Sequence, residues 1–239
     1  MFEHQSLQPA FVLHSRPYRD TSALVELFTR ECGRVTVIAK GARSNKNKNA
    51  ALWQPFTPVL VSWYGKTELK SASAIEPASA PFFLEGARLL SGMYLNELLH
   101  RLLSPLEPQP MMYEVYKVVL AELTSADVDI EIVLRSFERR LIDELGYGVS
   151  FTDAINKANL NPEKVYRFQA PYGFVLVDDG ARLDNRTFFS GEVLLEIEKE
   201  NYEASATKKS AKHLMRQILA NYLGPEPLNS RRLFASKRI

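Results

Sequence analysis

The segment from residue 33 to residue 64, GRVTVIAKGARSNKNKNAALWQPFTPVLVSWY, decides how this sequence folds. Both ends are rich in β-branched and aromatic side chains, and valine recurs at every second position in VTVIA at residues 35–39 and in VLVSW at residues 59–63. A period of two places alternate side chains on opposite faces of a β-strand. The middle, GARSNKNKN at residues 41–49, has the composition of a loop. We therefore expect two strands joined by a basic loop.

Three further segments near this pair also have strand composition. They are PAFVLHS at residues 9–15, ALVELFT at residues 23–29, and residues 69–75. Residues with turn chemistry separate them. Five short strands in about 75 residues fit a small closed barrel, for which the OB-fold is a good candidate. An SH3-like barrel would give much the same pattern.

Beyond EPASAP at residues 76–81 the apolar period becomes helical. Helices are expected over residues 89–102, 111–123, 130–145, 191–200 and 205–223, with Asp129 and Ser190 as N-caps. Residues 165–177 read as a β-hairpin. The sequence therefore predicts an α+β protein: an OB-fold domain over residues 1–80, and a mainly helical domain over residues 81–239 with a β insert near 150–190.

Composition narrows the class of protein. The chain has 239 residues, of which 46% are hydrophobic, so it can bury a core. Its single cysteine, Cys32, excludes an internal disulfide and a multi-cysteine zinc site. No apolar run approaches the roughly 20 residues that span a bilayer, and no secretion signal is evident at the N-terminus. We expect a cytoplasmic protein without a membrane partner.

The charge of the chain is distributed unevenly. Ten basic and six acidic side chains give residues 1–80 a charge of +4, whereas residues 81–150 carry −5 and residues 151–239 carry +3. Between Glu31 and Glu68 there is no acid at all. Cations without neighbouring acids favour a polyanionic partner such as nucleic acid. The alternative is a solvated basic loop.

Aromatic side chains accompany this basic run: Trp53, Phe56, Trp63 and Tyr64. On a surface they could stack on unpaired bases. In a small barrel they could equally fill the interior. The sequence leaves both readings open.

The predicted helices carry two further groups of cations. Lys208, Lys212 and Arg216 stand at i, i+4 and i+8, which suits either an anionic partner or a solubilising face. Arg135 and Arg139 border the apolar stripe of the 130–145 helix. Arg135 could pair with Glu131, or the arginines could line a groove for a peptide that ends in a carboxylate.

Signs of catalysis are poor. The 41–49 loop lacks a phosphate-loop motif, and the four histidines have no metal-ligand spacing. Cys32 reads as a turn or core thiol. Asp178, Asp179 and Asp184 form the one acidic cluster outside helical segments, and they lie in expected turns. A metal-dependent nucleic-acid enzyme and an RNA-binding OB-fold protein remain as alternatives.

Several motifs, in order along the chain, resemble the RecO family of bacterial recombination mediators. In the N-terminal third they are FVLHSRPY at residues 11–18, GRV at residues 33–35, AKGARS at residues 39–44 and QPFTP at residues 54–58. Farther on they are YLNEL at residues 94–98, LGYG at residues 145–148 and PLNSR at residues 227–231. The resemblance runs nearly the full chain.

The resemblance implies a non-enzymatic role in recombinational DNA repair. Members bind single- and double-stranded DNA, anneal strands, act with RecR, engage the C-terminal tail of single-stranded DNA-binding protein, and help RecA load. Arg135 and Arg139 become candidates for docking that tail. With the charge pattern, the resemblance predicts DNA contacts by Arg16, Arg34, Lys40, Arg43, Lys46, Lys48, Lys208, Lys212 and Arg216.

One departure from the family pattern concerns metal. Many members carry a four-cysteine zinc module after the LGYG motif, whereas residues 150–166 contain no cysteine here. We therefore expect no zinc and no other cofactor. A cytoplasmic protein associated with the nucleoid follows from the same resemblance.

Overall fold

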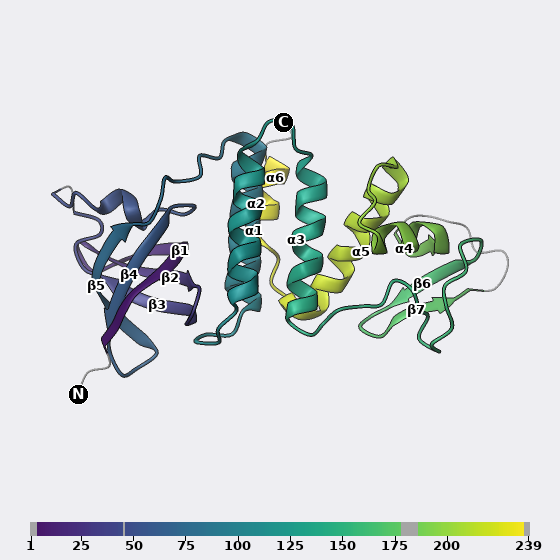
Figure 1. The fold of residues 1–239 in the computed structure, drawn as a ribbon, viewed down its shortest axis with the longest axis horizontal. Coiled ribbons are helices and arrows are strands. Elements are labelled where there is room, and N and C mark those ends of the chain that lie inside the picture. Colours follow the sequence, from purple (N-terminus) through teal and green to yellow (C-terminus); the bar gives the residue numbers. More distant parts are fainter. Residues whose placement is uncertain (1–3, 45, 178–185, 237–239) are drawn as a thin grey trace. The chain divides into compact units, whose positions relative to one another are not determined.

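The fold is that of a computed structural model, which describes residues 4–44, 46–177 and 186–236. It is a mixed α+β structure, as expected (Figure 1). The chain forms two compact units: residues 1–128 with 227–239, which we call the barrel unit, and residues 129–226, which we call the α3 unit. None of the helices in the described part is long and apolar enough to cross a bilayer.

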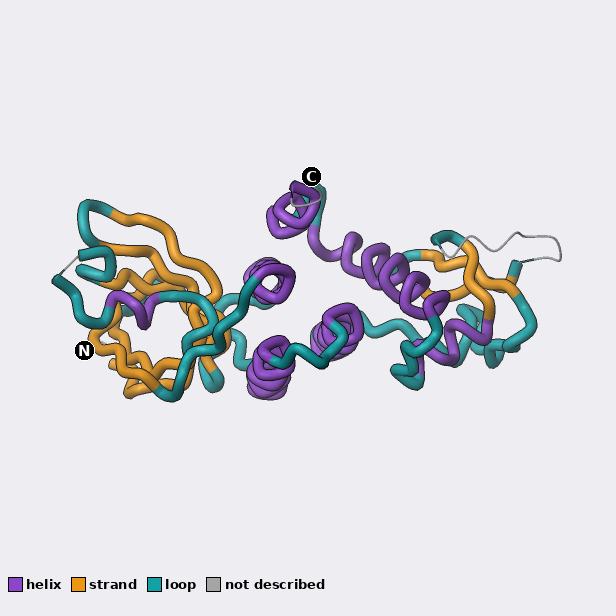
Figure 2. The backbone as a smooth tube through the Cα atoms, turned by 90° about the horizontal axis from the view of Figure 1, so that it is seen from above, coloured by secondary structure: helices purple, strands orange, loops and turns teal. Residues whose placement is uncertain are grey.

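The barrel has the topology of an OB-fold. Its strands are β1 (His4–Tyr18), β2 (Ser22–Thr29), β3 (Gly33–Ala39), β4 (Pro58–Tyr64) and β5 (Leu69–Pro77), which confirms the five predicted segments. They close in the order β1-β2-β3-β5-β4, because the long β1 pairs with β2 along one half and with β4 along the other. Only β3 and β5 run parallel. Figure 2 shows the closed ring of strands.

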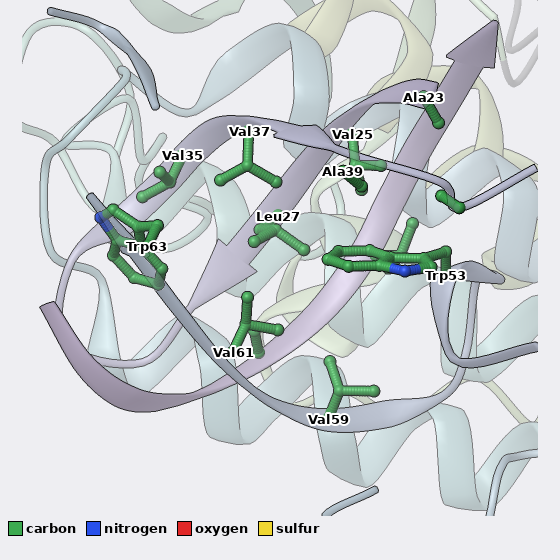
Figure 3. Packing of buried hydrophobic residues seen from close by; sticks show 13 residues of the cluster. Ala23, Val25, Leu27, Val35, Val37, Ala39, Trp53, Val59, Val61 and Trp63 are labelled. Atoms are coloured by element: carbon green, nitrogen blue, oxygen red, sulfur yellow. The ribbon is translucent and has the colours of Figure 1, made fainter. Parts of the chain in front are cut away.

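The interior of the barrel is filled by the alternating side chains that predict the strands. Val25 and Leu27 from β2, with Val35 and Val37 from β3, point inward and are at most 1% exposed (Figure 3). Trp63 and Trp53 complete this core, Trp53 from a short 3-10 helix (Ala50–Trp53) inside the β3–β4 loop. Trp53, Phe56 and Trp63 are 6%, 6% and 5% exposed. These three aromatics are therefore packing residues, and the base-stacking reading of them is wrong.

Helices α1 (Gly86–Leu102) and α2 (Pro110–Thr124) pack on the outside of the barrel. Phe11 and Phe28 place their rings against Tyr113 and Tyr116 of α2, with ring centroids 5.1–6.2 Å apart. Asn96 of α1 donates to the Leu13 carbonyl at 3.0 Å. Their contacts thus place these two helices in the same unit as the barrel. The change from strand to helix lies between Pro77 and Gly86, near the boundary expected at residue 80.

A short C-terminal helix, α6 (Asn229–Ser236), returns to the barrel unit and was not expected from the sequence. Glu97 of α1 binds its first turn: the carboxylate accepts hydrogen bonds from the Asn229 and Ser230 amides and the Ser230 hydroxyl, at 2.8, 2.9 and 2.6 Å. Burial raises the pKa of Glu97, but these hydrogen bonds outweigh it, and the pKa lies below its ordinary value. The YLNEL and PLNSR motifs therefore meet in one structural contact.

The α3 unit combines three helices with a small sheet. The helices are α3 (Ile130–Glu144), α4 (Gly191–Glu198) and α5 (Ser205–Leu223), and the strands are β6 (Val165–Gln169), β7 (Gly173–Leu176) and β8 (Phe188–Ser190). Asp129 and Ser190 accept hydrogen bonds from the Glu131 and Val193 amides, which confirms both predicted N-caps. The hairpin β6–β7 is confirmed as well, and β8 adds a strand to it. Asp178, Asp179 and Asp184 lie outside the described residues.

Candidate nucleic-acid interface

Two loops of the barrel leave from the same end. Because Tyr18 pairs with Ser22 and Ala23 pairs with Ala39, the β1–β2 turn and the start of the β3–β4 loop are neighbours. The Arg43 amide donates to the Thr21 carbonyl at 2.9 Å, which ties the longer loop to the turn. In OB-folds, the face of strands 2 and 3 and the loops that join strands 1–2 and 4–5 bind oligonucleotides, and the β1–β2 turn is one of these loops.

Six cations gather on these two loops and the adjoining end of β1, and we call them the basic end. They are Arg16, Arg19, Lys40, Arg43, Lys46 and Lys48. All six are exposed, and within the described part of the chain none has a carboxylate at ion-pair distance. Residues 19–21 and 40–50 contain a single acid, Asp20. The basic end is thus a surface of uncompensated positive charge.

Arg19 belongs to this surface although the sequence reasoning did not select it. It lies in the β1–β2 turn with φ +54°, and its guanidinium carbon is 5.3 Å from the centre of the Tyr18 ring. Its carbonyl accepts a hydrogen bond from Arg43 at 3.4 Å. The available signal was its position between the first two strands, because that loop flanks the binding face of OB-folds.

Arg34, in contrast, has partners within the barrel unit. Its guanidinium donates to Glu26 at 2.9 Å and to the Leu103 carbonyl at 3.1 Å, and its side chain is 15% exposed. Glu26 also accepts a hydrogen bond from Thr36. The charge of Arg34 is thus compensated by a carboxylate eight residues earlier in sequence, on the neighbouring strand, and we leave Arg34 out of the proposed interface.

His100 of α1 adjoins this pair, with its Nδ1 3.9 Å from the Glu26 carboxylate. Burial lowers its pKa, and the opposing effect of Glu26 does not offset this. The neutral imidazole is therefore favoured at neutral pH.

The lysines of α5 are paired with acids from the start of α3. Lys208 lies 2.5 Å from the Asp129 carboxylate, and Lys212 forms an ion pair with Glu131. The acids that α5 lacks along its own face are thus supplied by another helix. Arg216, one turn farther along, is exposed.

The arginines of α3 hold the α3 unit together. Arg135 is 6% exposed and forms an ion pair with the fully buried Glu138, while Glu131, the partner considered from sequence, binds Lys212. Arg139 donates to the Ile197 and Glu198 carbonyls at 2.7 and 3.0 Å and thereby satisfies the C-terminal end of α4. Both guanidiniums that could dock a peptide carboxylate are therefore engaged within this unit.

The described residues offer little for catalysis. Within residues 4–44, 46–177 and 186–236, no three His, Cys, Asp or Glu side chains gather as they would around a metal ion. Cys32 is half-buried in the β2–β3 turn, and burial raises the pKa of its thiol. The thiolate needed for nucleophilic attack is thus disfavoured.

Comparison of the sequence with known proteins identifies the family to which the chain belongs. Residues 1–81 match the family model described as "Recombination protein O N terminal", and residues 84–232 match "Recombination protein O C terminal". The chain is 42% identical to the DNA repair protein RecO of Pasteurella multocida over 231 residues, 96% of this chain and 95% of the relative. It is 38% identical to the RecO of Coxiella burnetii, over 98% and 99% of the two chains. With matches of this extent to both halves, the chain belongs to the RecO family.

Proposed function

We propose that this protein is a non-enzymatic mediator of recombinational DNA repair that binds DNA backbones through the basic end of its barrel. One observation carries the proposal: six exposed cations, with no acidic partner among the described residues, lie on two loops of an OB-fold and the adjoining end of β1. Membership of a family whose relatives are named DNA repair proteins supports DNA as the anion.

The binding mechanism follows from electrostatics. Each phosphate neutralised by Lys or Arg releases condensed counterions, which favours binding irrespective of base sequence. Because Val, Leu and Trp side chains fill the barrel, bases do not enter it, and the contact is made by the outer surface. A surface that neutralises two backbones also reduces their mutual repulsion, which would favour annealing of complementary strands.

Protein partners form the second part of the proposal. On the basis of family membership, we propose RecR and the C-terminal tail of single-stranded DNA-binding protein as binding partners. On the same basis, we propose that the protein helps RecA to load onto DNA. Arg135 and Arg139 would serve the tail only by exchanging their present contacts with Glu138 and with the end of α4. Because that exchange costs existing contacts, a mutational screen for the site that binds the tail should begin with other cations of the helical part.

The decisive experiment is a salt titration of binding to a labelled single-stranded DNA, followed by fluorescence anisotropy. For single strands the log–log slope is about −0.7 per phosphate neutralised. Replacing Lys40 and Arg43 by alanine should reduce the slope by about 1.4 and weaken binding about ten- to a hundredfold at low salt. Thermal stability should stay unchanged, since both side chains are exposed.

Three outcomes would contradict the proposal. Unchanged affinity of the Lys40/Arg43 variant would remove the barrel surface as the contact. A strong preference for an RNA oligonucleotide of the same sequence would favour an RNA-binding protein. Strand cleavage on addition of magnesium would indicate a nuclease.

A further inference from the structure

The β3–β4 loop has an internal framework of hydrogen bonds. Residues 40–50 carry four of the six cations of the basic end, and Ala42 is the one described residue among them that is buried. Exposed polar loops of this kind tend to be mobile, and every mobile residue that binding orders costs conformational entropy. Contacts between the loop's own polar groups can reduce that cost in advance.

Asn47 is the centre of this framework, between Lys46 and Lys48 in sequence. Its side-chain amide donates to the Gly41 carbonyl at 3.0 Å, and its side-chain carbonyl accepts from the Asn49 amide at 2.9 Å. Its backbone amide donates to the Ser44 carbonyl at 2.9 Å. One side chain thus joins Gly41, near the start of the loop, to Asn49, which precedes the 3-10 helix.

The start of the loop is held as well. Gly41 has φ +69°, a left-handed conformation that glycine adopts without strain, and its carbonyl accepts from both Asn47 and the Ser44 amide. Arg43 is tied to the β1–β2 turn through its amide. The backbone at Arg43 and over residues 46–49 is therefore held by contacts that the protein makes without a ligand.

We propose that Asn47 is a positioning residue for DNA: it preorganises the β3–β4 loop so that its cations meet the phosphates without a further ordering cost. This inference rests on the proposed function of the basic end. Asn47 need not touch DNA for the effect, because its hydrogen bonds act on the free protein. Its loss leaves the number of neutralised phosphates unchanged and lowers the affinity by a constant factor.

The chain offers a matched control in Asn49. It is the same residue type in the same loop, exposed where Asn47 is half-buried, and its side chain makes no capping hydrogen bond to the 3-10 helix that follows it. Replacing either asparagine by alanine leaves the net charge unchanged. The two variants differ in whether the loop framework loses a side-chain bridge.

The test measures affinity for a labelled single-stranded oligonucleotide at five or more salt concentrations, for the wild type, Asn47→Ala, Asn49→Ala and Lys46→Ala. Asn47→Ala should weaken binding roughly five-fold at every salt concentration, with a slope equal to that of the wild type. Asn49→Ala should match the wild type, and Lys46→Ala should lower the slope by about 0.7. Amide hydrogen exchange of the free Asn47→Ala protein should be faster at Asn49, with the barrel strands still protected.

Two results would overturn the role of Asn47. Equal affinities of Asn47→Ala and Asn49→Ala would show that loop order does not affect binding. A lower slope for Asn47→Ala would show that it removes phosphate contacts instead of arranging them. If the wild type itself fails to bind at low salt, the proposed function fails first, so the two failures are distinguishable.

Discussion

The basic end of the barrel and the contact between α3 and α5 both contain cationic side chains, but the charges are placed in different surroundings. At the basic end, exposed cations lie beside a single acid, Asp20. Between α3 and α5, Lys208 and Lys212 each have a carboxylate within ion-pair distance. If the basic end binds DNA as proposed, the comparison teaches that a cation marks a binding surface only where the fold leaves its charge uncompensated.

Burial adds a second difference. The Arg135–Glu138 pair is almost completely buried, whereas the two lysine pairs are partly exposed to solvent. Removing one partner of a buried pair leaves an unpaired charge in a medium of low dielectric constant, while a surface pair is screened by water and salt. The cations thus fall into three classes: exposed and without an acidic partner in the described part, paired at the surface, and paired in the interior. We expect each class to respond differently to mutation.

The largest effect is expected at the buried pair. Glu138→Gln keeps the shape of the side chain but removes its charge, so the Arg135 guanidinium loses its counter-ion inside the α3 unit. We expect a loss of about 3–5 kcal/mol in the free energy of unfolding, measured by urea denaturation. The double variant Arg135→Met, Glu138→Leu should regain most of this loss, because neither charge then remains buried. If Glu138→Gln lowers the free energy of unfolding by less than about 1 kcal/mol, the pair stabilises the unit through its packing and not through its charge.

An intermediate effect is expected for the paired lysines of α5. Replacing Lys208 and Lys212 by alanine should lower the free energy of unfolding by about 0.5–2 kcal/mol in total. The salt slope of DNA binding should stay as in the wild type, because Asp129 and Glu131 already compensate these charges.

The barrel variant with Lys40 and Arg43 replaced by alanine is the matched comparison, since it also removes two charges. It should show the reverse pattern, with a lower slope and unfolding free energy within about 0.5 kcal/mol of the wild type. Equal losses of slope in the two double variants would break the distinction between compensated and uncompensated cations.

The smallest effect concerns His100, which lies beside Glu26 and Arg34 at the junction of the barrel with α1. Because burial holds its pKa below the ordinary value of 6.5, the unfolded chain takes up the proton first as the pH falls. This contribution to stability is therefore complete above about pH 6.5 and is lost as the pH falls toward the folded pKa. Urea denaturation at pH 7.5 and 5.5 should show a smaller difference in His100→Gln than in the wild type. An identical difference would assign the pH dependence to other groups.

The sequence by itself determined the local elements. Alternation in β2, β3 and β4 and the helical period of α3 and α5 follow from side-chain spacing, and the caps at Asp129 and Ser190 need only residues within three positions. The absence of acids in the β3–β4 loop is likewise visible in the sequence, and it identified four of the six residues of the basic end.

Tertiary structure alone decided which of the other predicted cations have their charge compensated by an acidic side chain. Lys208 and Asp129 are 79 residues apart, Lys212 and Glu131 are 81 apart, and Glu97 binds the first turn of α6 from 132 residues away. The same holds for Trp53, which is buried in the barrel core with side chains such as Val25 and Val59 from other strands. Periodicity and caps depend on neighbours along the chain, whereas charge compensation and burial depend on neighbours in space, which exist only once the strands and helices have packed.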